Sequence, residues 1–253
     1  MISAVIITKN EEDNIEDCIL SLVGVVNEIV IVDSNSTDRT KEICSKFNVN
    51  FHIRDFLDYS DQKNYGNSLA KYDYILSIDA DERLSEELRN SIKQESNNYI
   101  YDVYSVSRRT NYCGKWINYS GWYPNKKFRI WKKGIAKWKG TIHEGLTFNT
   151  EQIGYLNGDL LHYSYKSINE HLDRINIYSS LMAEEIINKN KKITIFHLSV
   201  KPIFKILHRY FFKLGFMDGF YGLVISILSG YYTFFKYSKA IVMKKNINNY
   251  QNT

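Results

Sequence analysis

The segment ILSIDADERLSEEL, residues 75–88, places three acids within four positions directly after an apolar run. Residues 75–78 have the composition of a buried strand, and the acids Asp79, Asp81 and Glu82 follow at its end. Neighbouring carboxylates raise the free-energy cost of ionising one another, so we expect a cation beside them. Because alternate residues of an extended chain face the same side, Asp79 and Asp81 can converge while Ala80 leaves room.

The first hundred residues alternate between two periodicities. Apolar residues recur at helical spacing, for example at Ile15, Cys18, Ile19 and Leu22, between β-rich runs. Those runs are residues 3–8, 28–33, 49–53 and 74–80. The pattern predicts an α/β fold with a mostly parallel, Rossmann-like central sheet flanked by helices. Ligands of such sheets gather at the carboxyl ends of the strands, where TKNEE (8–12), DSNSTD (33–38) and DADE (79–82) lie.

The later sequence changes in character. We expect strands at 102–109, 126–131 and 153–165, the last folded as a hairpin at Asn157 and Gly158. Ser167 and Glu170 have the spacing of a capping box and predict a helix to about residue 189. We therefore predict a domain over residues 1–165, divided near residue 100, a packing helix over 166–190 and a basic helical extension over 191–253.

Composition narrows the class of protein. A chain of 253 residues with 44% hydrophobic content can bury one sizeable core. Cys18, Cys44 and Cys113 are odd in number and widely spaced, which favours buried reduced thiols over a disulfide framework or a zinc site. The opening MISAVIIT is typical of a strand and not of a secretion signal, so we expect a cytoplasmic protein.

The strand ends have the chemistry of a metal–diphosphate site. Asp33, Asp79 and Asp81 would meet at one sheet edge if their strands are neighbours. Hard carboxylate oxygens suit Mg²⁺ or Mn²⁺, which commonly take substrate phosphates as further ligands. An alternative remains open, in which Asp81 and Glu82 only begin a turn before a helix capped by Ser85.

Five segments occur in an order that resembles family 2 glycosyltransferases of the GT-A fold. They are AVIITKNEEDNIEDCILSL (4–22), EIVIVDSNSTDRT (28–40), DQKNYGNSLAKYDYILSIDADERL (61–84), GWYPNKKFRIWKKG (121–134) and IHEGL (142–146). The sequence most resembles the bacterial subgroup that adds glucose or a similar sugar to the inner core of lipopolysaccharide. The resemblance covers nearly the whole chain, and it implies that residues 1–100 hold the nucleotide sugar and residues 100–165 the acceptor.

The resemblance also implies roles for individual residues in donor binding. Thr8, Asn10, Glu11 and Asp33 would hold the uridine-type nucleoside. The triplet Asp79–Ala80–Asp81 corresponds to the DXD motif, with Asp81 as the more direct ligand of an Mn²⁺ or Mg²⁺ ion on the diphosphate. Lys63 would lie near the phosphates as a positive charge, although an ordinary solvated lysine is an equal alternative.

The acceptor side follows from the same resemblance. Glu144 matches the position of the catalytic base, with His143 or Asp102 as rivals. Aromatic rings cover the apolar faces of sugars, and arginine binds phosphate or carboxylate, so an acceptor site is expected at Trp122, Tyr123 and Arg129. His162 would approach the metal or the diphosphate, against the alternative of a hydrogen-bonded core histidine.

The C-terminal region is both basic and apolar. From Lys189 onward 11 Lys and Arg residues accompany one acid, Asp218, whereas the preceding residues contain 22 basic and 27 acidic side chains. We expect a helical pair lying on the anionic inner face of the cytoplasmic membrane. A single crossing by residues 214–235, an ordinary core helix and a homo-oligomer formed through this extension are the alternatives. Nucleic-acid binding is not expected, because the aromatic residues lie in an apolar run.

Together these features predict an inverting, metal-dependent enzyme that moves a hexose, by resemblance glucose, from a UDP-sugar to a lipid-linked acceptor such as the lipopolysaccharide inner core. One alternative is a GT-A transferase that builds capsule or exopolysaccharide or that glycosylates protein. Another, from a different class, is an inactive nucleotide-sugar-binding protein.

Overall fold

The structure is a computed structural model that describes residues 1–96, 98–140 and 144–251. It contains two compact units. The first comprises residues 1–109 and 125–163, and the second comprises residues 110–124 and 164–253. The division differs in detail from the expected boundary at residue 165, because residues 110–124 belong with the C-terminal helices.

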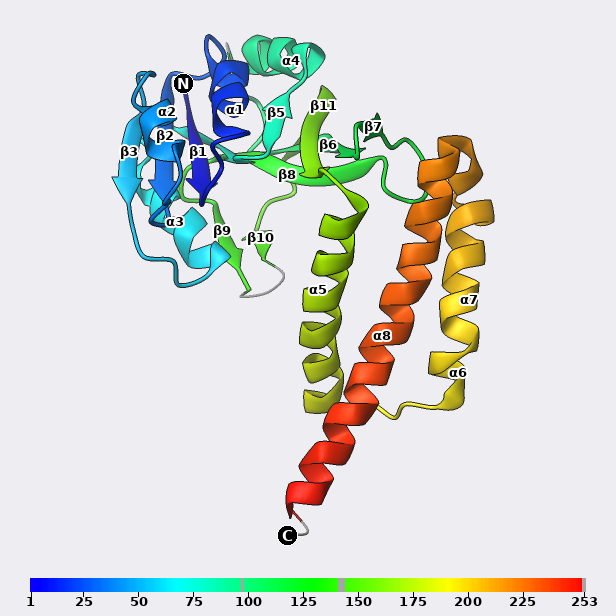
Figure 1. The fold of residues 1–253 in the computed structure, drawn as a ribbon. Helices are drawn as coiled ribbons and strands as arrows, with labels where there is room; N and C mark the ends of the chain where they lie inside the picture. The colour runs from blue at the N-terminus through cyan, green and yellow to red at the C-terminus, as the bar shows by residue number, and fades with distance from the viewer. Residues whose placement is uncertain (97, 141–143, 252–253) are drawn as a thin grey trace. The chain divides into compact units, whose positions relative to one another are not determined.

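Four parallel strands form the N-terminal half of the sheet in the first unit (Figure 1). They are β1 (Ile2–Thr8), β2 (Glu28–Asp33), β3 (Asn50–Ile53) and β4 (Tyr74–Asp79), in the order β3-β2-β1-β4. Their register pairs Thr8 with Asp33 and Ile7 with Asp79. The expected parallel βαβ half is thus confirmed, and the polar strand ends lie at one edge of the sheet.

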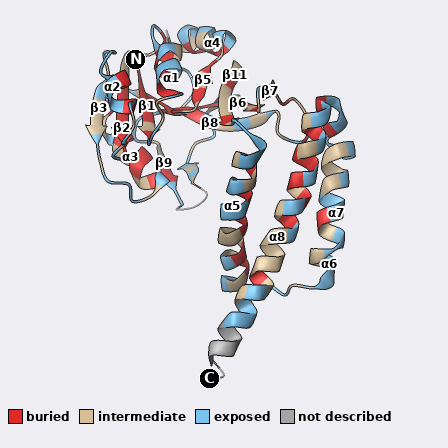
Figure 2. Cartoon of the chain, viewed as in Figure 1, coloured by how far each residue is buried: buried red, intermediate tan, exposed pale blue. Residues whose placement is uncertain are grey.

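Alternation along β1 divides the core between the two faces of this sheet. Ala4 and Ile6 pack with helices α1 (Ile15–Leu22), α2 (Thr40–Cys44) and α4 (Glu86–Ser96) in one cluster. Val5 packs on the other face in a second cluster, against which α3 (Tyr59–Leu69) places Tyr65 and Leu69. Figure 2 shows β1 and β2 mainly in the colour of buried residues. Both faces are covered, as the continuous apolar runs require.

The remaining strands extend the sheet beyond β4 in the order β8-β6-β11-β5. Their bounds are β5 (Glu82–Leu84), β6 (Val103–Tyr112), β7 (Lys115–Trp116), β8 (Asn125–Lys132) and β11 (Ile153–Tyr165); β9 (Ala136–Lys139) and β10 (Gly145–Phe148) form a separate antiparallel pair. β8 runs antiparallel to β4, so the sheet is mixed.

The expected hairpin at Asn157 and Gly158 is wrong, because β11 runs unbroken from Ile153 to Tyr165. Gly158 has φ +93° within this strand, and a Cβ atom there would lie 2.3 Å from the backbone nitrogen of Leu88. The glycine therefore allows close passage of the strand over the start of α4 and does not form a turn.

The second unit is mainly helical. Its elements are α5 (Ile168–Asn188), α6 (Ile195–Leu198), α7 (Val200–Leu207), a π-helical turn η1 (His208–Phe212), a 3₁₀ turn η2 (Gly215–Asp218) and α8 (Phe220–Gln251). The predicted cap of α5 is confirmed, since the side chain of Ser167 accepts a hydrogen bond from the backbone N–H of Glu170. α8 packs against α5 and α7 (Figure 1).

An aromatic cluster ties the ends of β6 and β11 to α5 inside this unit. The hydroxyl of Tyr112 lies 3.0 Å from Nδ1 of His171, and the ring of Trp122 packs edge-on against Tyr112. Burial, together with the charges of Arg174 and Arg209, lowers the pKa of His171 to about 4. The imidazole is therefore neutral at physiological pH.

In the described part of the chain, none of the helices carries an apolar stretch long enough to cross a bilayer.

Candidate active site

Asp79 lies between two buried cations at the end of β4. Its Oδ1 is 2.9 Å from Nζ of Lys63, and its Oδ2 is 3.0 Å from Nη2 of Arg129. Burial alone would raise the pKa of this carboxyl, but the charges of Lys63 and Arg129 outweigh it and hold the pKa well below its usual range. Asp79 is therefore an anion at any physiological pH, with both oxygens engaged by the protein.

Glu82 is the second carboxylate that contacts Arg129 in this network. It is fully buried, its Oε1 lies 2.6 Å from Nη2 of Arg129, and its Oε2 accepts a hydrogen bond from the backbone N–H of Asp79. Arg108 approaches the same Oε1 at 3.5 Å. Burial lowers the pKa of Arg129, but Glu82 and Asp79 more than compensate, so that its pKa is raised. A buried cation and a buried anion each stabilise the charged form of the other.

Glu144 enters the network through Lys63. Nζ of Lys63 donates to Oε1 of Glu144 over 3.1 Å and lies 4.6 Å from the ring centroid of Trp138. The lysine side chain is only 3% exposed, so it is not the ordinary solvated lysine considered above. One buried ammonium thus joins the first acid of the DXD segment to the expected catalytic base.

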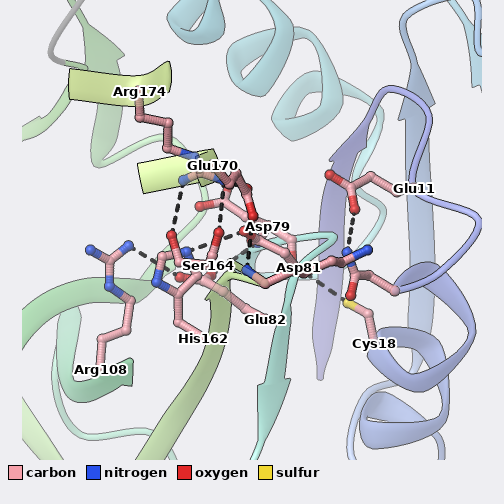
Figure 3. Close-up of polar contacts among 12 residues, drawn as sticks. Glu11, Cys18, Asp79, Asp81, Glu82, Arg108, His162, Ser164, Glu170 and Arg174 are labelled. Atoms are coloured by element: carbon pink, nitrogen blue, oxygen red, sulfur yellow. Dashed lines mark hydrogen bonds and ion pairs between the residues drawn. The ribbon is translucent and has the colours of Figure 1, made fainter. Parts of the chain in front are cut away.

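Asp81 faces β11 and not the buried cations. Its Oδ2 lies 3.2 Å from Nε2 of His162, and Figure 3 shows the two side chains directed toward each other. Nδ1 of His162 is buried and makes no hydrogen bond with any described residue. The two side chains come from adjacent segments, since His162 pairs with Glu82 in the β11–β5 ladder.

These contacts test whether the acids fit a divalent cation. Asp81 and His162 place an oxygen and a nitrogen side by side, which are donor types that Mn²⁺ accepts. Asp79 fits less well, because each of its oxygens already contacts a cation. Among the described residues no group of three or more Asp, Glu, His or Cys side chains is placed so that it could hold a metal ion. The arrangement fits a metal that is held in part by a ligand's phosphates.

Cys18 lies close to the acids but does not contribute a reactive thiolate. Its Sγ is 3.6 Å from the carbonyl oxygen of Asp79 (Figure 3). Burial raises the pKa of this thiol well above its ordinary value, and Glu82, Asp81 and Asp79 raise it further. All three cysteines are free, with Cys18 and Cys44 buried and Cys113 half-buried.

Hydrogen bonds join the loops that follow β1 and β2. Asn10 accepts a hydrogen bond from the backbone N–H of Thr37, and the backbone N–H of Glu11 donates to Oγ1 of Thr40. Asp33 is buried and accepts from the backbone N–H and hydroxyl of Ser36. Oγ1 of Thr8 is buried and has no hydrogen-bond partner among the described residues.

The expected acceptor residues belong to different units of the structure. Arg129 is buried and pairs with Asp79 and Glu82, so here it supports the acid cluster and is not an exposed anion clamp. Trp122 and Tyr123 belong to the second unit, where Trp122 packs in the aromatic cluster. His143 lies outside the described residues. The acceptor roles of these residues stay predictions.

Sequence reasoning missed the structural roles of Glu82 and Arg108. The position of Arg129 indicated that such partners exist. An arginine within the apolar run Phe128–Trp131 is expected to be buried, and a buried arginine needs acidic partners. The partner lies 47 positions earlier in the chain, and no local pattern specifies that pairing.

The sheet with its acidic edge at β4 has the architecture of a GT-A nucleotide-sugar transferase. The family model described as "Glycosyl transferase family 2" matches residues 3–152. An uncharacterized glycosyltransferase of Rickettsia typhi is 33% identical over 250 residues, which cover 94% of this chain and 86% of the relative. The chain belongs to glycosyltransferase family 2.

Two further comparisons are more distant. The lipopolysaccharide core biosynthesis glycosyltransferase LpsC of Rhizobium meliloti is 27% identical over 247 residues, covering 94% of this chain and 91% of LpsC. The crystal structure of S. aureus TarS 1-349 superposes with a TM-score of 0.50 at 16% identity, over 98% of this chain and 91% of that one. The second likeness supports the GT-A-like fold.

Proposed function

We propose that the protein transfers a hexose, specifically glucose, from a UDP-sugar to a hydroxyl group of a lipid-linked glycan of the lipopolysaccharide inner-core type, with inversion at the anomeric carbon. LpsC, similar to this chain over nearly all of both lengths, supports the acceptor class by its name. A solved complex of TarS with UDP-GlcNAc, of the same fold, supports the donor class. The observation that carries the proposal is the convergence of Asp79, Asp81, His162 and Glu144 around one strand end.

In this proposal the donor lies across the carboxyl edge of the parallel strands. Thr8, Asn10, Glu11 and Asp33 would form the nucleoside end, since they lie at or directly after the carboxyl ends of β1 and β2. Asp81 and His162 would hold an Mn²⁺ or Mg²⁺ ion together with the diphosphate. Such an ion neutralises the charge that develops on the departing diphosphate. Asp79 fixes Lys63 and Arg129 in place, and Lys63 in turn contacts Glu144.

Glu144 is the proposed base. The acceptor oxygen bonds to the anomeric carbon as the bond from that carbon to the diphosphate oxygen breaks, and the hydroxyl proton passes to the Glu144 carboxylate. UDP leaves with the bonding electron pair. Lys63 positions this carboxylate through its 3.1 Å contact and prevents it from turning toward the other acids.

We further propose that this reaction takes place at the inner face of the cytoplasmic membrane, where the protein binds as a peripheral protein. The support is the charge distribution, since the residues from Lys189 onward carry a net charge of +10 whereas the preceding residues carry −5.

Substitution Asp81→Ala tests the donor site. We expect calorimetric titration with UDP-glucose and Mn²⁺ to show a loss of affinity of about tenfold or more, because one of the two protein ligands is removed. Titration without metal should change little. Asp173→Ala, which removes an exposed carboxylate on α5, is the matched control. Unchanged metal-dependent binding by Asp81→Ala would contradict the assignment, and absence of donor hydrolysis by the wild type would favour an inactive binding protein.

A further inference from the structure

The turn between α7 and α8 exposes an unusual concentration of large apolar side chains. We define the apolar corner as Phe211, Phe212, Leu214, Phe216, Met217 and Phe220. All six are exposed, and the most exposed are Phe212 at 74% and Phe220 at 65%. Their neighbours Gly215 and Asp218 are buried, so the backbone of the corner is anchored while its apolar side chains point away from the protein.

Exposed apolar residues continue from the corner along both helices. On α7 they recur at helical spacing at Ile203, Phe204 and Leu207, and on α8 at Leu223, Ile227, Tyr231 and Phe234. The helices use other residues to pack together, for example Gly230, where an added Cβ atom would lie 2.4 Å from a side-chain carbon of Ile206. A contiguous exposed apolar surface of this kind marks an interaction site.

The charges around this surface identify its partner. From Lys189 onward the single acid is Asp218, which is buried and engaged by hydrogen bonds, whereas Lys205 and Lys213 are exposed beside the corner. A symmetric contact with the same surface of a second copy would bring like charges together. A lipid surface offers an anionic headgroup layer above an apolar interior, and it therefore matches both the lysines and the aromatic side chains.

The corner also holds the loop that carries two of the proposed acceptor residues. The carboxylate of Asp218 accepts hydrogen bonds from the backbone N–H groups of Asn118 and Tyr119 and from the hydroxyl of Ser120, at 3.0–3.2 Å. The backbone N–H of Ser120 donates to the carbonyl oxygen of Lys213, and Arg209 donates to the carbonyl oxygen of Ser120. Residues 118–120 are thus fixed to the corner, and Trp122 and Tyr123 follow directly.

We propose that the apolar corner inserts into the headgroup region of an anionic lipid bilayer and fixes the loop of Trp122 and Tyr123 at that surface. This inference rests on the proposed function only in the identity of the acceptor. In this arrangement the turn between α7 and α8 makes the deepest contact with the bilayer. In a pair of helices that lies flat, the whole length of each helix would make that contact. Phe212 and Met217 are 74% and 56% exposed, so both side chains are expected to lose hydrating water on insertion.

Vesicle flotation of the full chain tests the proposal, with phosphatidylcholine vesicles that contain or lack phosphatidylglycerol. We expect the double variant Phe212→Ser/Met217→Ser to bind the anionic vesicles about tenfold more weakly or worse than the wild type. The control Leu57→Ser/Ile100→Ser removes two equally exposed apolar side chains from the first unit and should bind as the wild type does. Thermal unfolding and UDP titration without vesicles should be unchanged in both variants.

Equal flotation of the corner variant and the wild type would overturn the proposal. So would light scattering that shows a wild-type dimer converted to a monomer by the corner substitutions, because the corner would then be a subunit interface. Failure of the wild type to bind UDP would count against the proposed function alone, since the vesicle measurement requires no nucleotide.

Discussion

Asp79 forms two ion pairs in addition to the donor-site role that its motif predicts. Its two oxygens contact Lys63 and Arg129, and these cations depress its pKa although burial acts in the opposite direction. A depressed carboxyl pKa stabilises the folded state at every pH above the ordinary aspartate range. That stability is lost only as the pH falls from about 3.9 toward the folded-state pKa, because the unfolded chain then binds the proton first.

The variant Asp79→Asn tests this role. We expect it to lower the free energy of unfolding by about 3 kcal/mol at pH 7, because two buried cations each lose one of their carboxylate partners. Urea unfolding followed by tryptophan fluorescence should give a nearly constant difference from the wild type between pH 7 and pH 5, and a smaller difference below about pH 4. A difference that already shrinks at pH 6 would mean that another group is being titrated.

Glu144 is the residue on which the proposed chemistry depends. Glu144→Gln keeps an oxygen that can accept from Lys63 but removes the proton acceptor, so donor affinity should persist while the transfer rate falls by about 10²–10⁴-fold. The measurement is UDP release with acceptor present, together with titration of UDP-glucose. Glu151→Gln, an exposed glutamate after β10, is the control. Full turnover by Glu144→Gln would show that another residue is the catalytic base.

The sequence identified the acids of this site better than the cations that neutralise them. Asp33, Asp79 and Asp81 could be placed because parallel strands bring their carboxyl ends to one edge. The bridge from Lys63 to Glu144 joins residues 81 positions apart, and the pairing of Arg129 with Glu82 joins residues 47 apart. Such contacts depend on how helices and later strands pack, which local spacing does not determine.

At the scale of elements, β11 shows a local signal overridden by tertiary packing. Asn-Gly between alternating apolar residues is a strong hairpin signal, yet the strand continues. The conformation of Gly158 is used for close passage over Leu88 and not for chain reversal. The parallel strands and α5 were predictable because their periodicity is long and agrees with the capping and turn residues around them.

Gly158→Ala tests that explanation. The new methyl group would meet the backbone nitrogen of Leu88, and the residue would keep a positive φ, so we expect a loss of about 2 kcal/mol or more in unfolding free energy. Thermal unfolding of both variants is the measurement. Gly145→Ala in β10, where a Cβ atom meets nothing within 4 Å, should be nearly neutral. Equal melting temperatures for the two variants would show that the strand can move away from α4.

At the scale of the whole molecule, the net charge of +5 combines an acidic majority of the chain with a strongly basic C-terminal part. If the basic part serves membrane binding, the position of the positive charge matters and its total does not. Lys205 on α7 and Lys213 within the turn of the apolar corner are exposed, and both lie away from the residues of the donor site in sequence. Each lysine near an anionic surface contributes about 1 kcal/mol of attraction.

The double charge reversals Lys205→Glu/Lys213→Glu and Lys46→Glu/Lys93→Glu give two proteins of identical net charge, with the changes beside the apolar corner or in the first unit. We expect the first to bind phosphatidylglycerol vesicles at least about tenfold more weakly at low salt, and the second to resemble the wild type. The difference should shrink in 0.5 M NaCl, because salt screens exposed charges. Equal weakening by both variants would show that vesicle binding follows total charge, and the basic C-terminal part would then have no special role in it.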